Sequence, residues 1–328
     1  MTLAFPLALA AFAIAIEAAS GYPQVLYRAL GHPVTWIGAL IARLDASLNR
    51  DADSFAWRRA KGVVSLFILL AIAGGGAVAL QVAVRHLPLP IGFALLAIAA
   101  SSLVAQRSLH DHVRAVADAL DKGGVEAGRE AVSMIVGRDT GALDLYGVSR
   151  AAIESLAENF SDGVVAPVFW LGAGGLPGGV IYKTINTADS MIGHRSERHF
   201  AYGWAAARLD DLVNLPASRL AALFIALAAS ATHGADAGRA VKSVFRDARH
   251  HKSPNAGWPE AAMAGALGLK IAGPRSYHGQ LTEDHWMGDG RAEATANDIR
   301  RALTLYRRAC AIEFGLVAAL ATLLIARG

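Results

Sequence analysis

Four long apolar runs constrain the fold of this chain more than any other feature of its sequence. They cover residues 2–19, 62–84, 88–106 and 311–326. A helix needs about 20 apolar residues to cross the hydrocarbon core of a membrane. The whole chain, with 54% hydrophobic and 18% charged residues, is also too apolar for an ordinary soluble enzyme. The sequence therefore predicts an all-α, polytopic, multi-pass protein of the cell membrane.

Two further apolar runs, 164–181 and 215–231, are ambiguous. The first contains Pro167, Pro177 and five glycines, which suits a re-entrant or buried segment better than a helix that faces lipid. We expect neither run to cross the membrane fully. The chain would then have four spans, with a catalytic region of helices and loops on the cytoplasmic face.

The distribution of Lys and Arg is the basis of this topology. The positive-inside rule assigns loops that are rich in these residues to the cytoplasm. It places 20–61, 107–162 and 233–310 inside and the 85–90 turn outside. Since these assignments fix the sides of the flanking loops, the two ambiguous runs must either both cross the membrane or both not cross it.

Charge and cysteine content exclude other classes of protein. The net charge of +4 comes from dispersed Lys and Arg rather than from a basic groove, so membrane lipid is an expected partner and nucleic acid is not. The single cysteine, Cys310, excludes an intramolecular disulfide and a multi-cysteine metal site. No repeat or low-complexity linker divides the sequence, and we expect one domain over residues 1–328.

Three acidic residues form a stripe before the first ambiguous run. Glu154, Glu158 and Asp162 fall within roughly 80° of arc on an α-helix. Their neighbours are strongly apolar, and acids in such surroundings usually bind metal, pair with Arg or act in catalysis. The alternative is a solvated helix face on which Arg150 pairs with Glu154.

A second polar block follows the same run. Tyr182 stands where a phosphate loop requires glycine, which excludes a standard P-loop. Hard oxygen ligands suit Mg²⁺ and cationic side chains suit phosphate. The candidates for such a site are Lys183, Asn186, Asp189, His194 and Arg195.

Three shorter motifs are open to two interpretations each. Asp210, Asp211 and Asn214 form either a handle for Mg²⁺ and phosphate or a helix cap, and the turn that carries Asn255, Trp258 and Glu260 forms either a substrate wall or a capping turn. The loop around Arg138 either binds an anion or is a plain turn. Gly123-Gly124 predicts a break between two helices, and 273–291 predicts a soluble loop without metal-ligand spacing.

Together these motifs resemble the CobD/CbiB family, the membrane-bound adenosylcobinamide-phosphate synthases of cobalamin biosynthesis. The resemblance runs from His32-Pro33-Val34 to about Gly290. The motifs that carry it, in order, are Gly137-Arg138-Asp139-Thr140, Glu154-(x3)-Glu158-Asn159-(x2)-Asp162-Gly163, Lys183-(x2)-Asn186-Thr187-(x)-Asp189-Ser190-Met191, Asp210-Asp211-(x2)-Asn214 and Ser253-Pro254-Asn255-Ala256-Gly257-Trp258-Pro259-Glu260.

The resemblance implies an ATP-dependent amide ligase. It would join adenosylcobyric acid to (R)-1-amino-2-propanol O-phosphate and give adenosylcobinamide phosphate, ADP and phosphate. A carboxylate is a poor electrophile, so ATP would activate it before the amine attacks. Such chemistry needs Mg²⁺ ligands, phosphate-binding cations and a base. Other cobalamin-biosynthesis enzymes are further expected partners.

Roles for the candidate residues follow from the resemblance as hypotheses. We expect the catalytic set to be Glu154, Glu158, Asp162, Lys183 and Asp189, with Mg²⁺ held by Glu158, Asp162 and Asp189 and the amine proton accepted by Glu154. We expect ATP to contact Arg138, Asn186, His194 and Arg195. We expect the other substrates to contact Asn159, Asp210, Asp211, Asn214, Asn255, Trp258 and Glu260.

Rival classes predict features that the sequence lacks. A membrane prenyltransferase would carry two equivalent Asp-rich motifs, and a transporter would show repeated halves with acids inside clear spans. A component of a corrinoid pathway that anchors or transports without its own catalysis is the remaining alternative. Such an anchoring or transport component would not need so many polar motifs whose residue types match the needs of a ligase.

Overall fold

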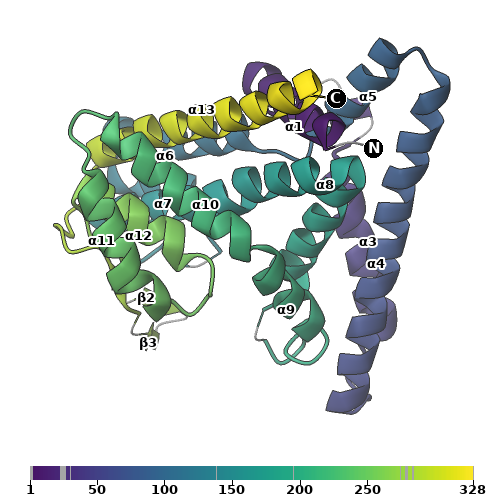
Figure 1. The fold of residues 1–328 in the computed structure, drawn as a ribbon. Coiled ribbons are helices and arrows are strands. Elements are labelled where there is room, and N and C mark those ends of the chain that lie inside the picture. Colours follow the sequence, from purple (N-terminus) through teal and green to yellow (C-terminus); the bar gives the residue numbers. More distant parts are fainter. Residues whose placement is uncertain are drawn as a thin grey trace. The chain divides into compact units, whose positions relative to one another are not determined.

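The structure is a computed structural model, and it describes residues 3–22, 27–29, 31–137, 139–194, 196–273, 275–277, 280–282 and 284–327. Its elements are drawn in Figure 1. The α-helices are α1 (Ala4–Ser20), α3 (Pro33–Leu48), α4 (Phe55–Ala83), α5 (Leu89–Ser101), α6 (Gln106–Ser133), α7 (Leu145–Phe160), α8 (Ala166–Ile192), α9 (Trp204–Val213), α10 (Leu215–Ser230), α11 (Ala237–Asp247), α12 (Gly257–Leu267) and α13 (Ala296–Arg327). Single turns of other helix types are η1 (Val84–His86), η2 (Ser161–Val165) and η3 (Ala248–His250).

The predicted all-α class is confirmed, with a small addition. Four short strands lie in or directly before the segment 273–291, where the sequence predicts a loop: β1 (Ile271–Ala272), β2 (Arg275–Tyr277), β3 (Gln280–Thr282) and β4 (Trp286–Met287). β1 pairs antiparallel with β4, and β2 with β3. Strands of two or three residues leave almost no alternating pattern in a sequence, which is why this segment reads as a loop.

Four helical stretches in the described chain are long and apolar enough to cross a membrane, namely Phe55–His86, Leu89–Ser133, Leu145–Ile192 and Ala296–Arg327. Three of them cover the predicted spans 62–84, 88–106 and 311–326, with Pro88 alone left outside. The predicted span 2–19 forms α1, whose 17 residues make it shorter than these stretches. α9 and α10 meet at a bend of 45° and would add a fifth span if they crossed together. The multi-pass character is thus confirmed.

The first ambiguous run lies inside a helix that is broken. Gly175 has φ 63° and ψ −157° within α8, a conformation that glycine adopts at little cost, and Pro177 follows two residues later. The second arm of α8, which carries the second polar block, therefore takes its own direction. The break predicted at Gly123-Gly124 is also present, since Gly124 has φ 69° inside α6.

The helices group into two compact units that interleave along the sequence. Unit 1 comprises Met1–Ala105, Ala166–Asn214 and Leu316–Gly328, and unit 2 comprises Gln106–Val165 and Leu215–Gly315. Each unit is assembled from separated segments of the chain. The chain therefore passes between the units several times, and no single linker marks their boundary in the sequence.

In unit 1, α8 and α9 pack with α3 and α4 around a shared apolar core. The buried side chains of this core are Ile41, Leu66, Leu69, Ala188, Ile192, Tyr202 and Ala206. Two glycines of α4 permit close packing. A Cβ at Gly74 would lie 3.1 Å from the side chain of Ile181, and a Cβ at Gly62 would lie 1.9 Å from the backbone oxygen of Tyr202. Gly74 therefore lets α4 approach α8 closely.

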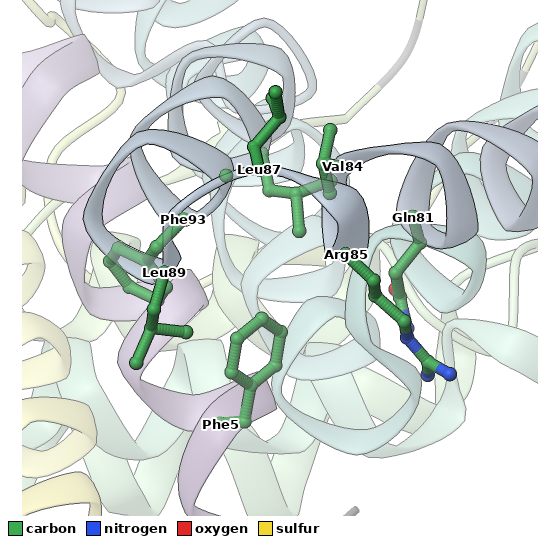
Figure 2. A pocket seen from close by; sticks show the side chains of 9 residues that line it. Phe5, Gln81, Val84, Arg85, Leu87, Leu89 and Phe93 are labelled. Atoms are coloured by element: carbon green, nitrogen blue, oxygen red, sulfur yellow. The ribbon is translucent and has the colours of Figure 1, made fainter.

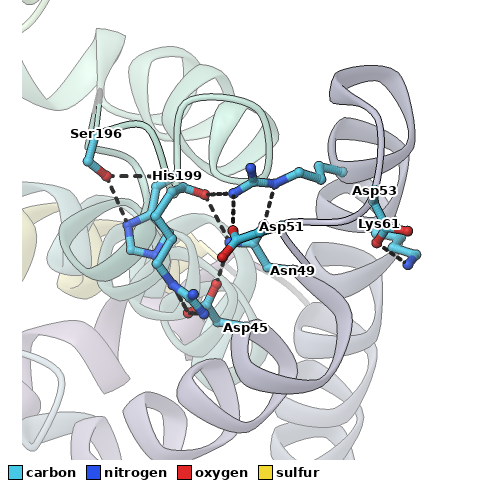
Figure 3. A network of polar contacts seen from close by, with 9 residues as sticks. Asp45, Asn49, Asp51, Asp53, Lys61, Ser196 and His199 are labelled. Atoms are coloured by element: carbon cyan, nitrogen blue, oxygen red, sulfur yellow. Dashed lines mark hydrogen bonds and ion pairs between the residues drawn. The ribbon is translucent and has the colours of Figure 1, made fainter.

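A polar network ties α3 to the turn that leads into α9 (Figure 3). The carboxylate of Asp45 accepts hydrogen bonds from Asn49 Nδ2 at 2.8 Å and from Arg198 Nη2 at 2.9 Å, and His199 Nε2 lies 3.5 Å away. Burial raises the pKa of Asp45, but the hydrogen bonds from Asn49 and Arg198 and the charge of Arg198 outweigh it, so the pKa lies below its ordinary value. The network fixes the chain that precedes α9.

In unit 2, α12 is the central helix. It packs against α7, α10 and α11, and η2 packs against α10. Close approach to α11 depends on Gly265, where a Cβ would lie 2.4 Å from the backbone oxygen of Arg239. The acidic stripe on α7 and η2 and the polar turn before α12 therefore belong to the same packed unit.

Candidate functional site

The second polar block of the sequence presents one face of α8 to α9 in unit 1. Tyr182, Asn186 and Asp189 are spaced i, i+4 and i+7, so they share a helix face. Asn186 Nδ2 donates to Asp210 Oδ1 at 3.4 Å, and Tyr182 Oη donates to Asn214 Oδ1 at 2.9 Å. The α8 and α9 motifs, which are separate in the sequence, thus form a single cluster.

Asn214 acts as a helix cap, one of its two predicted interpretations. It is the C-cap residue of α9, and its Nδ2 donates to the backbone oxygen of Asp210 at 3.2 Å. Asn214 is also buried, with 1% of its surface exposed. Its cap and its bond to Tyr182 hold Asp210 in place against α8, so capping and site membership are compatible.

Three carboxylates of the cluster lie close enough to repel one another. Asp189 interacts unfavourably with Asp211, and Asp210 with Asp189 and Asp211. Asp210 is buried, while Asp211 is partly neutralised by Arg208, whose Nη1 lies 3.1 Å from its Oδ2. Three like charges, one of them buried, are costly without a cation, so this cluster is suited to bind one.

The carboxylate of Asp189 lies directly against Gly193, which follows α8. A Cβ at Gly193 would lie 1.9 Å from Asp189 Oδ1. The backbone N–H of Gly193 donates to the backbone oxygen of Asp189 at 2.7 Å. Glycine at this position therefore leaves room for the carboxylate at the end of the helix.

Two basic residues lie beside this cluster. Lys183 is half-buried on α8, and His194 is exposed just after it, within electrostatic reach of Asp189. A third residue, His32, is the N-cap of α3, where its Nδ1 accepts a hydrogen bond from the N–H of Val34 at 3.2 Å. Burial and the nearby charge of Lys183 lower the pKa of His32. Only tertiary packing brings His32 to Lys183.

The acidic stripe in unit 2 is less uniform than the sequence predicts. Glu154 is buried, Glu158 is exposed and Asp162 is half-buried. The α-helix ends at Phe160, and Asp162 lies in η2, a turn of π-helix. The common arc calculated for an α-helix therefore applies to the two glutamates and not to Asp162. Turns of π-helix are frequent at functional sites.

Two residues beside the acidic stripe, Arg150 and Asn159, contact groups outside the stripe. Arg150 Nη1 donates to the backbone oxygen of Ala292 at 2.7 Å, and its guanidinium lies 5.6 Å from the ring centre of Trp286. Asn159 Nδ2 donates to the backbone oxygen of Ser155 at 2.9 Å. Asn159 is thus bonded to its own helix, although its side chain is exposed.

Of the residues predicted around the turn before α12, Asn255 lies in the turn, and Trp258 and Glu260 lie at the start of α12. Asn255 and Glu260 are buried and Trp258 is half-buried. Glu260 Oε1 lies 3.8 Å from Nε2 of His251. The guanidinium of Arg219 stacks on Trp258. Sequence reasoning did not select Arg219, but a signal existed, since it is the single charged residue in the apolar run 215–231.

Two predicted residues, Arg138 and Arg195, lie outside the described part of the chain. The predicted Mg²⁺ ligands fall in both units, with Asp189 in unit 1 and Glu158 and Asp162 in unit 2. Their sharing of one ion stays a prediction.

The chemistry of the unit 1 cluster fits Mg²⁺ bound together with a nucleotide. Among the described residues, no three His, Cys, Asp or Glu side chains are placed to hold a metal ion. Mg²⁺ that binds with phosphates, however, needs only one or two carboxylates from the protein. Asp189 suits this role, because no described side chain donates a hydrogen bond to its carboxylate. Asp210, which repels it, is the second candidate.

A cavity of about 470 Å³ in unit 1 contains none of the predicted residues. It lies at the turn between α4 and α5. Figure 2 shows the rings of Phe5 and Phe93 beside Leu89, with Arg85 and Gln81 on the other side. Its lining is mostly apolar, which suits a hydrocarbon chain better than the phosphorylated substrates expected here.

Comparison with known proteins gives a consistent result. A family model described as "CobD/Cbib protein" matches residues 10–306. A protein of Sinorhizobium fredii named cobalamin biosynthesis protein CobD is 51% identical over 303 residues, which are 91% of each chain. Proteins of the same name from Rhodobacter capsulatus and Brucella suis are 51% and 46% identical, over 94% of this chain and 96% and 94% of their own. No solved structure matches the chain.

Proposed function

The chain belongs to the CobD/CbiB family, and from this premise we propose that it is the ATP-dependent ligase that joins adenosylcobyric acid to (R)-1-amino-2-propanol O-phosphate. The names of its relatives support the coarser statement, that it takes part in cobalamin biosynthesis. The finer statement assigns it the amide-forming step, in which ATP is consumed and adenosylcobinamide phosphate, ADP and phosphate are released.

The observation that carries this proposal is the carboxylate cluster between α8 and α9. Asp189, Asp210 and Asp211 repel one another, Asp210 is buried, and Lys183 lies on the same helix as Asp189. A protein that only anchors other enzymes gains nothing from this costly arrangement. An enzyme that binds a nucleotide and its metal ion does, since their charges offset the repulsion.

In unit 1 the chain's own residues would bind and orient the nucleotide. Asp189 and Asp210 would hold Mg²⁺, which when bound neutralises phosphate charge and favours transfer of a phosphoryl group. Lys183 would donate hydrogen bonds to phosphate oxygens. His32, whose lowered pKa keeps it neutral near pH 7, would leave the positive charge at this place to Lys183.

In unit 2 the acids would handle the amine. An amine must lose its proton before it attacks an activated carboxylate, and Glu154 would accept that proton as a general base. Glu154 is buried on α7, so a substrate amine that reached it would be shielded from bulk water. In this proposal Glu158 and Asp162, which the sequence analysis assigns to Mg²⁺, would instead attract the substrate ammonium, and Trp258 would contact the corrinoid.

The test is an assay of the detergent-solubilised protein with adenosylcobyric acid, aminopropanol phosphate and Mg-ATP, in which corrinoid mass and ADP are followed together. We expect a mass gain equal to amide formation with stoichiometric ADP. ADP without the mass gain would indicate a different acceptor amine. Absence of both signals from folded protein would refute the proposal and favour the anchoring or transport alternative.

Matched variants locate the chemistry. Asp189→Ala and Lys183→Ala should lower ligation by at least about 100-fold, as expected for groups that act on transferring phosphate. Asp51→Ala is the control, because Asp51 belongs to the same unit and its side chain is 84% exposed. Full activity of both site variants would exclude this cluster as the nucleotide site.

A further inference from the structure

Arg219 differs from three paired arginines of unit 2 in its electrostatic environment. Arg246, Arg291 and Arg300 each lie within 2.7 Å of an aspartate oxygen. Among the described residues, no carboxylate oxygen lies within 4.0 Å of the Arg219 guanidinium. Arg219 is also the single charge of α10, a helix that is otherwise apolar. A half-buried charge in such a helix is costly and usually has a function.

The guanidinium of Arg219 is held by contacts at one nitrogen and one face. Its Nη1 donates to Ser218 Oγ at 2.9 Å, to Asn255 Oδ1 at 3.0 Å and to the backbone oxygen of Leu215 at 3.2 Å. One face lies 4.4 Å from the ring centre of Trp258. Asn255 is itself bonded to Ser218 Oγ at 3.1 Å. These contacts fix the plane and the rotation of the group.

The opposite edge of the Arg219 guanidinium, formed by Nε and Nη2, is available to donate hydrogen bonds. Nε–H and the Nη2 group lie side by side on the edge away from Nη1, and they form the fork that binds two oxygens of a carboxylate or phosphate. No described residue accepts a hydrogen bond from either nitrogen, because the contacts of Arg219 all involve Nη1. An arginine fixed on one side and open on the other is preorganised for an oxyanion.

The surroundings of Arg219 indicate which oxyanion. α10, which carries Arg219, packs against η2 with Asp162 and against α12, and α12 packs against α7 with Glu154 and Glu158. Unit 2 thus combines acids that suit an ammonium group with an arginine whose open edge suits an anion. A small molecule with an amine at one end and a phosphate at the other matches both.

We propose that Arg219 binds the phosphate group of the aminoalcohol phosphate substrate through Nε and Nη2. This assignment rests on the proposed function for the identity of the substrate. It makes Arg219 a specificity-determining residue, which distinguishes phosphorylated from unphosphorylated amino alcohol. Asn255 and Trp258 then act as its positioning residues, in addition to any contact of their own with the corrinoid.

The test measures binding separately from turnover, by calorimetry on the detergent-solubilised full chain. The probes are (R)-1-amino-2-propanol O-phosphate, unphosphorylated 1-amino-2-propanol and Mg-ATP. Arg219→Gln should weaken binding of the phosphorylated probe about 10- to 100-fold, as expected for loss of a charge-assisted bidentate contact. Its affinity for the other two probes should not change. Arg219→Lys should recover only part of the loss, because an ammonium lacks the fork.

Arg300→Gln is the matched control, since Arg300 is already paired with Asp118 and Asp121 in the same unit. It should leave all three affinities unchanged. A weakened affinity for Mg-ATP alone in Arg219→Gln would assign the arginine to the nucleotide and overturn the proposal. Unchanged affinities with only a lower Tm would make its role structural and also overturn it. Binding of the phosphorylated probe that depends on Arg219, in a protein that forms no amide, would refute the proposed function and support this inference.

Discussion

Substitution of Gly193 by alanine tests whether the position of one carboxylate controls activity. The new Cβ would lie 1.9 Å from Asp189 Oδ1 and 2.7 Å from the backbone oxygen of Asp189. Ordinary contact begins near 3.4 Å, so the carboxylate oxygen must retreat by roughly 1.5 Å. A misplacement of about 1 Å in a catalytic group can cost about 100-fold in rate. We therefore expect kcat/KM for ligation to fall by about that factor.

The assay follows corrinoid mass and ADP release in parallel with Tm in detergent. Gly174→Ala is the control, because it makes the same change in α8 at a glycine with no atom within 4 Å of its added Cβ. We expect Gly174→Ala to keep wild-type kcat/KM. Wild-type activity in Gly193→Ala, with an unchanged Tm, would refute the idea that the Asp189 carboxylate must lie at the end of α8.

A double-mutant cycle separates this effect from general damage. If Gly193→Ala acts by displacing Asp189, it has nothing left to displace once Asp189 is alanine. The double variant should then be no less active than Asp189→Ala alone, which is complete non-additivity. Additive losses would mean that Gly193→Ala harms the enzyme by another route.

Three further predictions concern unit 1. Gly62→Ala should cost about 1–3 kcal/mol and lower Tm, since its Cβ would lie 1.9 Å from the backbone oxygen of Tyr202, whereas Gly75→Ala in the same helix has nothing within 4 Å and should not lower it. Asp45→Asn should lower Tm at pH 7. Because the pKa of Asp45 is lower in the folded protein than in the unfolded chain, its contribution is complete above about pH 4 and is lost as the pH falls through the folded value, so the Tm difference should shrink in acid. Asp210→Asn removes one of three repelling carboxylates and should raise Tm while ligation falls; a lower Tm would contradict the repulsion.

Local features of the fold were predictable where the chemistry of a residue type restricts it to one kind of environment or backbone conformation. Long apolar runs can only be buried or cross a membrane, so three of four predicted spans coincide with long apolar helices. Gly124 marks a helix break because glycine adopts positive φ at little cost. Asn214 caps a helix because its short amide reaches the last turn. Each of these follows from a few neighbouring residues.

Features that depend on distant segments were not predictable in the same way. The spacing of the acids predicts an even α-helical period through Asp162, but the chain forms a turn of π-helix there. Arg219 was passed over because a lone arginine in an apolar run has no pattern around it. Its candidate role as an anion-binding residue follows only from its contacts with Asn255 and Trp258, which lie 36 and 39 residues later in the chain.

The sequence by itself determined the membrane character of this protein, its helical class and the chemical types that its site contains, because composition and spacing carry that information. Tertiary structure alone decided which of those residues meet. It brought the carboxylates of α8 and α9 together, set His32 beside Lys183, and left one edge of Arg219 open. The physical reason is that helix packing sets the distances between residues far apart in the chain, and charge repulsion and hydrogen bonding depend on those distances.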